Sequence, residues 1–467
     1  MSEENDSIPR ILISGSRSQV GKFVLTVGLI HELRRKGLSV SCSVIGPNLL
    51  QAVVFRRITG RYVRTLDRNV LTRDQSLLAL SQSTVGADIQ LILGSRGLFD
   101  GELGSGSLQG ADAEYAAVSG TPVLLVVDSS GFGPSIGAVV KGFETLSKEF
   151  AFAGALLNRF DNEGEITKRR DDIGDFFEAS GLELPLGFVP PIELDSEPPP
   201  RRVSQSVNYT SLSRKFFVST AELIREHVNL DRIIEAGKQA RPLPSNLQTE
   251  QRFSRRVKIA VSEDSCFGLL FQDNLELLRF YGAELVPFSP LADRSLPKSI
   301  GGVYITGAYL DEYGRELSEN DSMRRALRDF ADSGGVLYAE AAGAAYMCSE
   351  YEVGEEREVY SGVGLLKGRA VRQKEEHRYL EGVTIEESIL GQPGTHLKGM
   401  SVSDWRFSES SPTMRTLRYE DPTVPERAEG FSSGAQIFCT FAFHHFGSNS
   451  VIVRNFVDAA EVVYIFF

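Results

Sequence analysis

A glycine-framed loop that ends in a lysine is the part of this chain best suited to chemistry. Residues 9–23 read PRILISGSRSQVGKF, in which a short apolar strand leads to Gly15 and the loop closes at Gly21 and Lys22. Backbone N–H groups in such a loop bind phosphate, and the lysine reaches the terminal phosphates of a nucleotide. The next residue is Phe23, where phosphoryl-transfer loops carry a Ser or Thr that holds Mg²⁺. The pattern predicts a phosphate-binding loop that has lost one metal contact.

The first half of the chain alternates strand-like and helix-like segments that would position this loop. Continuous apolar runs are typical of strands buried on both faces of a parallel sheet. They cover residues 10–14, 38–46, 89–94, 122–128 and 153–159. The amphipathic segments between them predict helices, so this half is expected to be a doubly wound α/β domain, spanning residues 1–205.

The alternation stops at a proline-rich stretch, residues 190–202, which can form neither a helix nor a central strand. A helical stretch over about 212–238 and a linker follow, and we assign residues 206–250 to this connection. A second α/β pattern begins at residue 257, with strand-like and helix-like segments at 257–264, 274–284, 284–290, 301–309, 322–335 and 336–343. The sequence therefore predicts a second domain over 251–467.

Composition and charge restrict the class of protein. The 467 residues carry a formal net charge of −12, which disfavours nonspecific binding to nucleic acid. No apolar run approaches the roughly 20 residues of a membrane span, and the acidic start MSEENDSIP is unlike a signal peptide. The four cysteines are scattered, which is typical of reduced structural thiols. We expect a cytoplasmic protein that binds neither nucleic acid nor a membrane.

The order of the sequence motifs resembles one family over nearly the whole chain. The phosphate loop is followed by GPN, GLFDG, LNR, FSPLADRSLP and AEAAG, as in cobyrinic acid a,c-diamide synthases. The resemblance implies an N-terminal P-loop domain of dethiobiotin-synthetase type, which uses ATP to phosphorylate a corrinoid carboxylate. It also implies a C-terminal class I glutamine amidotransferase domain that supplies ammonia, and hence two doubly wound α/β domains.

The nucleotide site departs from the family pattern at three positions. Where the family has Thr, Asp and Glu near the metal, this chain has Phe23, Asn48 and Leu93. Because Mg²⁺ requires oxygen ligands, the three changes together predict that ATP binds without hydrolysis and without a firmly held Mg²⁺. The resemblance implies a set of nucleotide-binding residues: Gly15, Ser16, Arg17, Ser18, Gly21, Lys22 and the base-contacting Asn158. A purely structural turn cap is the alternative role for Asn158.

The glutaminase motif is also changed. The family presents a cysteine nucleophile on a tight strand-to-helix turn, and a histidine activates it. This chain has Ala341 at the cysteine position and Phe443 at the histidine position. We interpret Cys348 as a core residue within the following helix, and the pair His444 and His445 as one core and one solvent-exposed residue. The comparison with the family motifs predicts no catalytic residue in this chain.

An arginine cluster follows the GPN turn and suits an anionic ligand, since guanidinium groups bind carboxylates and phosphates. Its members are Arg56, Arg57, Arg61, Arg64 and Arg68. Family members bind a polycarboxylate tetrapyrrole, and the resemblance implies Asp100, Arg61 and Arg64 as substrate-binding residues. Solvated charges on a helix face are the alternative interpretation.

Further arginines lie near the expected ligands. Arg201 and Arg202 stand where the family has an Arg-His pair. Arg17 and Arg96 add positive charge beside the phosphate loop, where we expect them to stand in for lost metal charge.

Together these features predict a catalytically inactive relative of the family that binds a tetrapyrrole, a nucleotide or a partner protein. The partner would be a second copy of the chain or an active paralogue. An active amidotransferase that uses ATP and free ammonia is the first alternative, and a phosphate-loop module that senses nucleotide without turnover is the second.

Overall fold

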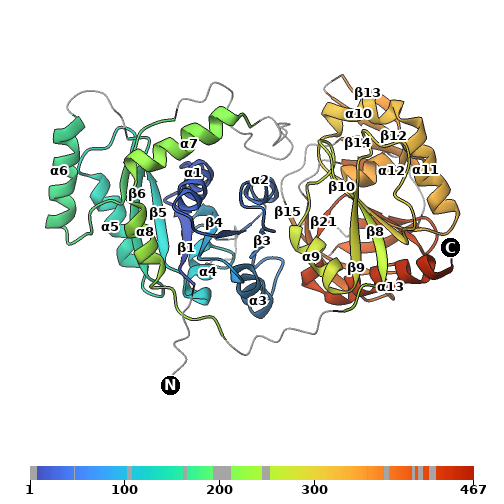
Figure 1. The fold of residues 1–467 in the computed structure, drawn as a ribbon, viewed down its shortest axis with the longest axis horizontal. Coiled ribbons are helices and arrows are strands. Elements are labelled where there is room, and N and C mark those ends of the chain that lie inside the picture. Colours follow the sequence, from blue (N-terminus) through green and yellow to red (C-terminus); the bar gives the residue numbers. More distant parts are fainter. Residues whose placement is uncertain are drawn as a thin grey trace. The chain divides into compact units, whose positions relative to one another are not determined.

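The computed structural model describes residues 8–46, 48–101, 108–160, 166–192, 212–244, 253–354, 356–372, 378–401, 405–408, 414–419 and 427–466. Within them the chain forms two compact units (Figure 1). Unit 1 holds the described residues up to 192 together with 212–244, and unit 2 holds those from 253 onward. The predicted domain boundaries at 205 and 250 lie outside the described residues and stay predictions.

Unit 1 contains a seven-stranded parallel sheet in the order β3-β2-β4-β1-β5-β6-β7. The strands are β1 (Arg10–Gly15), β2 (Val40–Val44), β3 (Arg64–Thr65), β4 (Ile89–Gly97), β5 (Val123–Asp128), β6 (Phe152–Asn158) and β7 (Gly187–Val189). The short edge strands β3 and β7 were not expected from the sequence. Strand β1 lies in the middle of the sheet, so the loop after it emerges at the carboxyl edge, where open α/β sheets bind ligands.

Eight helices accompany this sheet in the part of unit 1 that the structure describes. They are α1 (Lys22–Arg35), α2 (Leu49–Thr59), α3 (Arg73–Thr84), α4 (Asp112–Ser119), α5 (Ile136–Leu146), α6 (Ile166–Ala179), α7 (Arg214–His227) and α8 (Leu230–Gly237). The predicted helical stretch at 212–238 is two helices, because the Asn229 side chain accepts the Arg232 N–H at 3.1 Å and starts α8. Helix α7 lies beside α1 (Figure 1).

The main sheet of unit 2 has the order β21-β16-β15-β18-β19-β20-β11-β10-β8-β9. Its parallel part comprises β8 (Val257–Ser262), β9 (Ala283–Phe288), β10 (Gly302–Gly307), β11 (Val336–Ala341) and β20 (Ile437–Thr440). Antiparallel strands extend it: β15 (Arg378–Thr384), β16 (His396–Ser401), β18 (Met414–Tyr419), β19 (Arg427–Ser432) and β21 (Phe443–His444). Both units therefore confirm the predicted α/β class.

A second, four-stranded sheet has the order β13-β12-β14-β17. It is formed by β12 (Cys348–Val353), β13 (Glu358–Ser361), β14 (Leu366–Arg372) and β17 (Trp405–Phe407). The described helices of unit 2 are α9 (Gln272–Phe280), α10 (Leu310–Glu319), α11 (Asp321–Asp332), α12 (Ala342–Met347), the 3₁₀ turn η2 (Phe446–Ser448) and α13 (Ser450–Phe466). Each unit has its own apolar core, which holds its functional loops in place.

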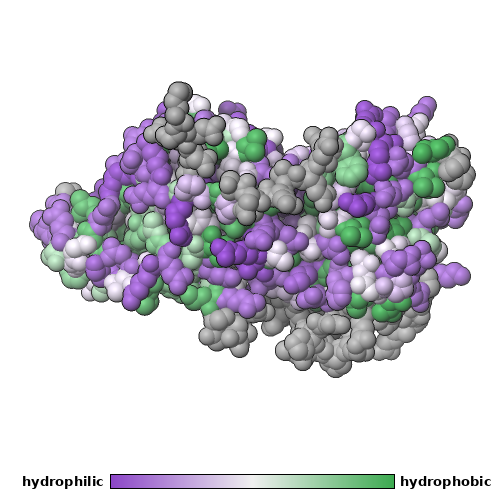
Figure 2. Space-filling model, turned by 90° about the horizontal axis from the view of Figure 1, so that it is seen from below, coloured by the Kyte–Doolittle hydropathy of each residue, from purple (hydrophilic) through white to green (hydrophobic). Residues whose placement is uncertain are grey.

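The face shown in Figure 2 is mostly hydrophilic, with hydrophobic residues scattered over it. In the described part of the chain, no helix combines the length and apolar character that crossing a membrane requires.

Gly28 in α1 allows the close approach of α7. A Cβ at this position would overlap the Thr220 carbonyl oxygen and lie 2.5 Å from Ile224 Cγ1. Replacing a glycine by alanine inside a helix normally raises the free energy of unfolding by about 0.5–1 kcal/mol. We expect Gly28→Ala instead to lower the free energy of unfolding by about 2 kcal/mol, because α7 must shift.

Gly142→Ala in α5 is the matched control, since a Cβ there meets no atom within 4 Å. Urea unfolding of the full chain checks both variants, and stabilisation by Gly28→Ala would show that α1 and α7 are not packed this closely.

Candidate functional site

The predicted phosphate loop joins β1 to α1. Gly15 is the last residue of β1, and Ser16 donates its backbone N–H to the Val126 carbonyl of β5 at 2.9 Å. Gly21 precedes α1 in the left-handed conformation, with φ of 94°. The side chains of Arg17 and Ser18 are exposed at the tip of the loop. The backbone thus has the strand–loop–helix form that a phosphate site needs.

Asn158 at the end of β6 supports this loop. Its Nδ2 donates to the Val20 carbonyl at 2.7 Å, and the residue is buried. The structure therefore brings Asn158 together with the loop, through a bond to the loop backbone. Contact with a base stays a prediction.

Lys22 is the first residue of α1, and its side chain is buried. Its Nζ donates to the Arg96 carbonyl at the end of β4. Burial lowers the pKa of Lys22, while the carboxylates of Asp112 and Asp100 oppose that change. The ammonium group is thus held at one place beside the loop.

Two arginines share one carboxylate next to the loop. Asp128 Oδ2 pairs with Arg17 at 2.8 Å and with Arg159 at 2.7 Å, and Arg159 also donates to the Gln19 carbonyl at 3.1 Å. Burial opposes ionisation of Asp128, but the bonds from Ser130 and Arg159 outweigh it and lower the pKa. Two guanidinium charges on one carboxylate leave this side of the loop positive.

Phe23, directly after Lys22, packs its ring against rings from two other helices. Its ring stacks on Phe55 of α2 at 5.9 Å and on Phe216 of α7 at 6.3 Å between centroids. Replacing it with a hydroxyl residue would therefore remove an aromatic contact among three helices.

The other two positions at which we predict a changed metal contact also have local structural roles. Asn48 Nδ2 donates to the Ile45 carbonyl at 2.6 Å, and Leu93 is buried within β4. Asp100, which the family pattern retains, is exposed and accepts the Gly97 N–H at 3.0 Å.

The predicted substrate arginines are not brought to the loop. Arg61 donates to the carbonyls of Val85 and Gly86, which precede β4 and so lie at the amino edge of the sheet, opposite the loop. Arg64 is buried in β3 and donates to Gln82 of α3 at 3.2 Å.

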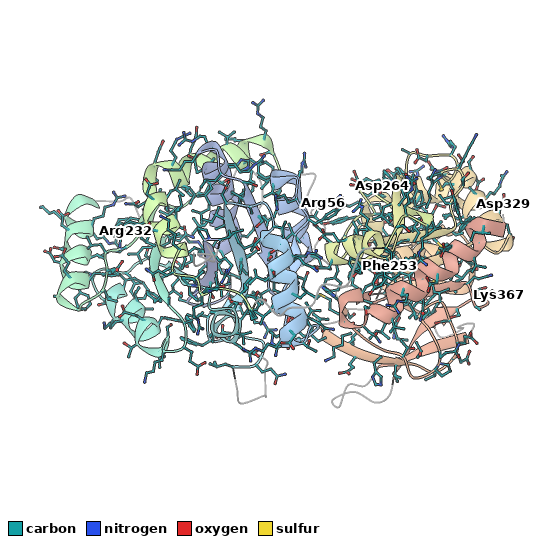
Figure 3. All side chains as sticks on the ribbon, turned by 60° about the horizontal axis from the view of Figure 1, so that its bottom comes forward. Arg56, Arg232, Phe253, Asp264, Asp329 and Lys367 are labelled. Carbon is teal, nitrogen blue, oxygen red and sulfur yellow. The ribbon has the colours of Figure 1, made fainter. Side chains whose placement is uncertain are left out.

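The other predicted arginines also have contacts within unit 1 where the structure describes them. Arg56 of α2, labelled in Figure 3, lies over the Tyr62 ring at 4.5 Å. Arg201 and Arg202 fall outside the described residues. The Arg96 side chain is exposed and donates to the Gly101 carbonyl at 3.3 Å.

Sequence reasoning missed one residue under the loop. Asp112, the first residue of α4, accepts the Ser14 hydroxyl at 2.6 Å and the Ser95 N–H at 2.9 Å. Burial raises its pKa to about 6. An aspartate in the first turn of a helix is common on any surface, so its position in the sequence carries no signal of this role.

The turn from β11 to α12 in unit 2 has the form of a nucleophile elbow. Ala341 has φ of 51° and ψ of −119°, a conformation that costs a residue with a Cβ about 1–3 kcal/mol. It is fully buried, and it pairs with Gly307, where β10 ends. The backbone that would present a nucleophile is present, and the side chain at its apex is a methyl group.

A buried polar network supports this turn from the other face of β11. The Glu340 carboxylate accepts bonds from Tyr304 Oη at 2.8 Å, Tyr338 Oη at 2.9 Å and the His444 N–H at 2.9 Å. Burial raises the pKa of Glu340 to about 7, and burial lowers that of His444 to about 3. His444 is therefore uncharged at neutral pH, and its Nδ1 lies 2.8 Å from Tyr338 Oη.

Two predictions for this region were wrong. Cys348 is buried as expected, but it begins β12 because α12 ends at Met347. His445 is buried rather than solvent-exposed, because the chain turns into η2 directly after β21, beneath α9. Its Nε2 lies 3.5 Å from Asp273 Oδ2. Phe443 is buried in β21, and strand alternation directs it to the face opposite His444.

The strain at Ala341 predicts an unusual response to glycine. Replacing a buried alanine in a regular strand with glycine costs about 1.5–2 kcal/mol through lost burial and added chain entropy. We expect Ala341→Gly to cost at least about 1 kcal/mol less than Ala339→Gly, since relief of the positive φ offsets the loss.

Ala339 is the matched control because it is fully buried in the same strand. Chemical denaturation measures both variants, and equal losses would contradict a strained turn at Ala341.

Comparisons with known proteins agree with these features. Residues 258–451 match the family model of the CobB/CobQ-like glutamine amidotransferase domain. The cobyrinate a,c-diamide synthase of Listeria monocytogenes serotype 4b is 30% identical over 97% of this chain and 99% of that protein. The protein of the same name from Archaeoglobus fulgidus is 29% identical over 97% of this chain and 98% of its own length.

Solved structures are less similar. PurLQS from Thermotoga maritima covers 45% of this chain and 99% of its own, at 13% identity and a TM-score of 0.34, which is too low to carry an argument. The conclusion rests on the near-full-length sequence match: this chain belongs to the cobyrinate a,c-diamide synthase family.

Proposed function

We propose that this chain is a non-catalytic member of its family that binds a nucleotide through the phosphate loop of unit 1. The observation that carries the proposal is the turn at Ala341, which keeps the strained backbone of a nucleophile elbow around a side chain that cannot attack. A costly backbone without its reactive group is what loss of chemistry from an inherited scaffold would leave.

The described cysteines do not offer a replacement nucleophile. Thiolates attack, whereas thiols do not, and burial in apolar surroundings keeps a thiol protonated. Burial raises the pKa of both Cys266 and Cys348 well above the ordinary value, and both residues are fully buried. The neutral, buried His444 already serves the Glu340 network.

The residues beside the loop do not fit Mg²⁺. This ion takes oxygen ligands in near-octahedral geometry, and phosphoryl transfer relies on it to neutralise phosphate charge. Phe23 and Leu93 offer none, and Asn48, whose amide nitrogen bonds the Ile45 carbonyl, offers one neutral amide oxygen in place of a carboxylate. Among the residues that the structure describes, no group of three or more His, Cys, Asp or Glu side chains could hold a metal ion. This donor set favours binding without turnover.

Positive charge from the protein itself favours a polyphosphate. Lys22 lies at the loop, and Arg17 and Arg159 meet at Asp128. Guanidinium groups match phosphate oxygens with paired N–H donors. Binding of a tetrapyrrole carboxylate remains a further prediction, because Arg61 and Arg64 bond other groups of unit 1. Binding of a paralogous partner also remains a prediction.

ATP binding should be independent of metal. In isothermal titration we expect ATP dissociation constants with EDTA and with Mg²⁺ to agree within about threefold, and Lys22→Ala to weaken binding at least about tenfold, or about 1.4 kcal/mol. Lys148→Ala is the control for loss of one positive charge, since Lys148 is exposed in unit 1 after α5 and belongs to no predicted site. A strict Mg²⁺ requirement would contradict the proposal.

Turnover should be absent. We expect no ATP hydrolysis or amide formation with cobyrinate and either glutamine or ammonia, because position 341 carries no thiol and the described residues beside the loop do not fit Mg²⁺. Product formation that disappears in Lys22→Ala would instead establish the active amidotransferase.

A further inference from the structure

The carboxylate of Asp112 lies beneath the phosphate loop and is 1% exposed. It is fixed from two strands: Ser14 of β1 donates its hydroxyl at 2.6 Å, and Ser95 of β4 donates its N–H at 2.9 Å. Asp112 is also the first residue of α4, where the helix dipole favours a negative charge. A buried aspartate with three such supports is held in one orientation.

The end of β4 bulges over this carboxylate. Between the pairs Ile13↔Leu93 and Gly15↔Gly97, β1 advances 15 − 13 = 2 residues while β4 advances 97 − 93 = 4. The bulge contains Ser95, whose N–H donates to Asp112, and Arg96, whose carbonyl accepts a hydrogen bond from Lys22 Nζ. Only glycine fits at position 94, because a Cβ there would overlap the Asp112 carboxylate.

Among the described residues, few charged groups influence the Asp112 carboxylate. Asp112 is influenced by Lys22 from α1 and by Asp100 from the loop after β4, besides its bonds to Ser14 and Ser95. Glu114 of the same helix is occupied by the Gly110 N–H at 2.7 Å and by Arg68 at 3.4 Å. Burial favours the uncharged form of Lys22. Two carboxylates favour the charged form, and Asp112 has the larger effect of the two.

We infer that Asp112 is a positioning residue for Lys22: it fixes the β4 bulge whose carbonyl anchors the ammonium group, and it sets a buried negative charge near that anchor. The inference rests on the proposed binding function and deepens it. With Lys22 held charged in advance, the loop takes a tetrahedral anion, such as a phosphate group, without a divalent cation to neutralise it.

Sulfate is a suitable probe, since it is a tetrahedral dianion that does not titrate between pH 6.5 and 10. Its affinity for the full chain is measured by isothermal titration across this range at constant ionic strength. Asp112→Asn preserves the shape: its amide oxygen can accept the Ser95 N–H, and its NH₂ can donate to Ser14. Asp74→Asn, an exposed first-turn aspartate of α3, is the matched control.

In the wild type we expect sulfate affinity to fall at alkaline pH as Lys22 loses its proton. In Asp112→Asn the midpoint of this fall should move down by about one pH unit or more, while Asp74→Asn follows the wild type. Below that midpoint Asp112→Asn should bind sulfate at least as tightly as the wild type, because a negative charge has been removed. A purely structural role would weaken binding at all pH values without moving the midpoint.

Ser14→Ala serves as the second variant, because it keeps the Asp112 charge and removes the hydrogen bond from the Ser14 hydroxyl. The pH midpoint of sulfate binding should move down in this variant too, by less than in Asp112→Asn. Equal midpoints for the wild type and both variants would overturn the inference while leaving anion binding intact. Absence of sulfate binding to the wild type at every pH would overturn the proposed function together with it.

Discussion

Both candidate sites depend on one backbone constraint, the abrupt turn from a parallel strand into a helix. Gly21 makes this turn with φ of 94°, and Ala341 makes it with φ of 51°. Such a turn brings the first N–H groups of the helix and the side chain at its apex to the carboxyl edge of the sheet. The positions of Lys22, just after Gly21, and of Glu340, just before Ala341, follow from it, and Asn158 of β6 bonds the loop at Val20.

The residues at the two turns, Phe23 and Ala341, have different surroundings. At the loop of unit 1, Phe23 contributes packing among α1, α2 and α7, so its ring gains contacts that a hydroxyl would not make. At the elbow of unit 2, Ala341 gains nothing comparable, and the Glu340 network with Tyr304, Tyr338 and His444 holds the neighbouring backbone. That network is built from bonds on the other face of β11 and does not involve the Ala341 side chain.

Much of the fold was predictable, and the sites were predictable only in part. Apolar runs such as 122–128 identify buried strands because every residue must be apolar on both faces of a parallel sheet. Cys348 and His445 were misplaced because a helix end and a turn into a 3₁₀ segment depend on neighbours distant in sequence. Arg61 and Arg64 remain predicted ligand contacts, because charge is visible in sequence, whereas the carbonyls and amide that engage them here are not.

The sequence by itself determined the family, the α/β class, the loop at Gly15–Lys22 and the absence of a cysteine at position 341, because motif order and residue identity need no coordinates. Tertiary structure alone decided that Phe23 packs among three helices, that Ala341 is strained, and that Asp112 meets Ser14 across 98 residues of chain. The physical reason is that these contacts join segments distant in sequence, and their energies depend on burial and geometry that residue types do not encode.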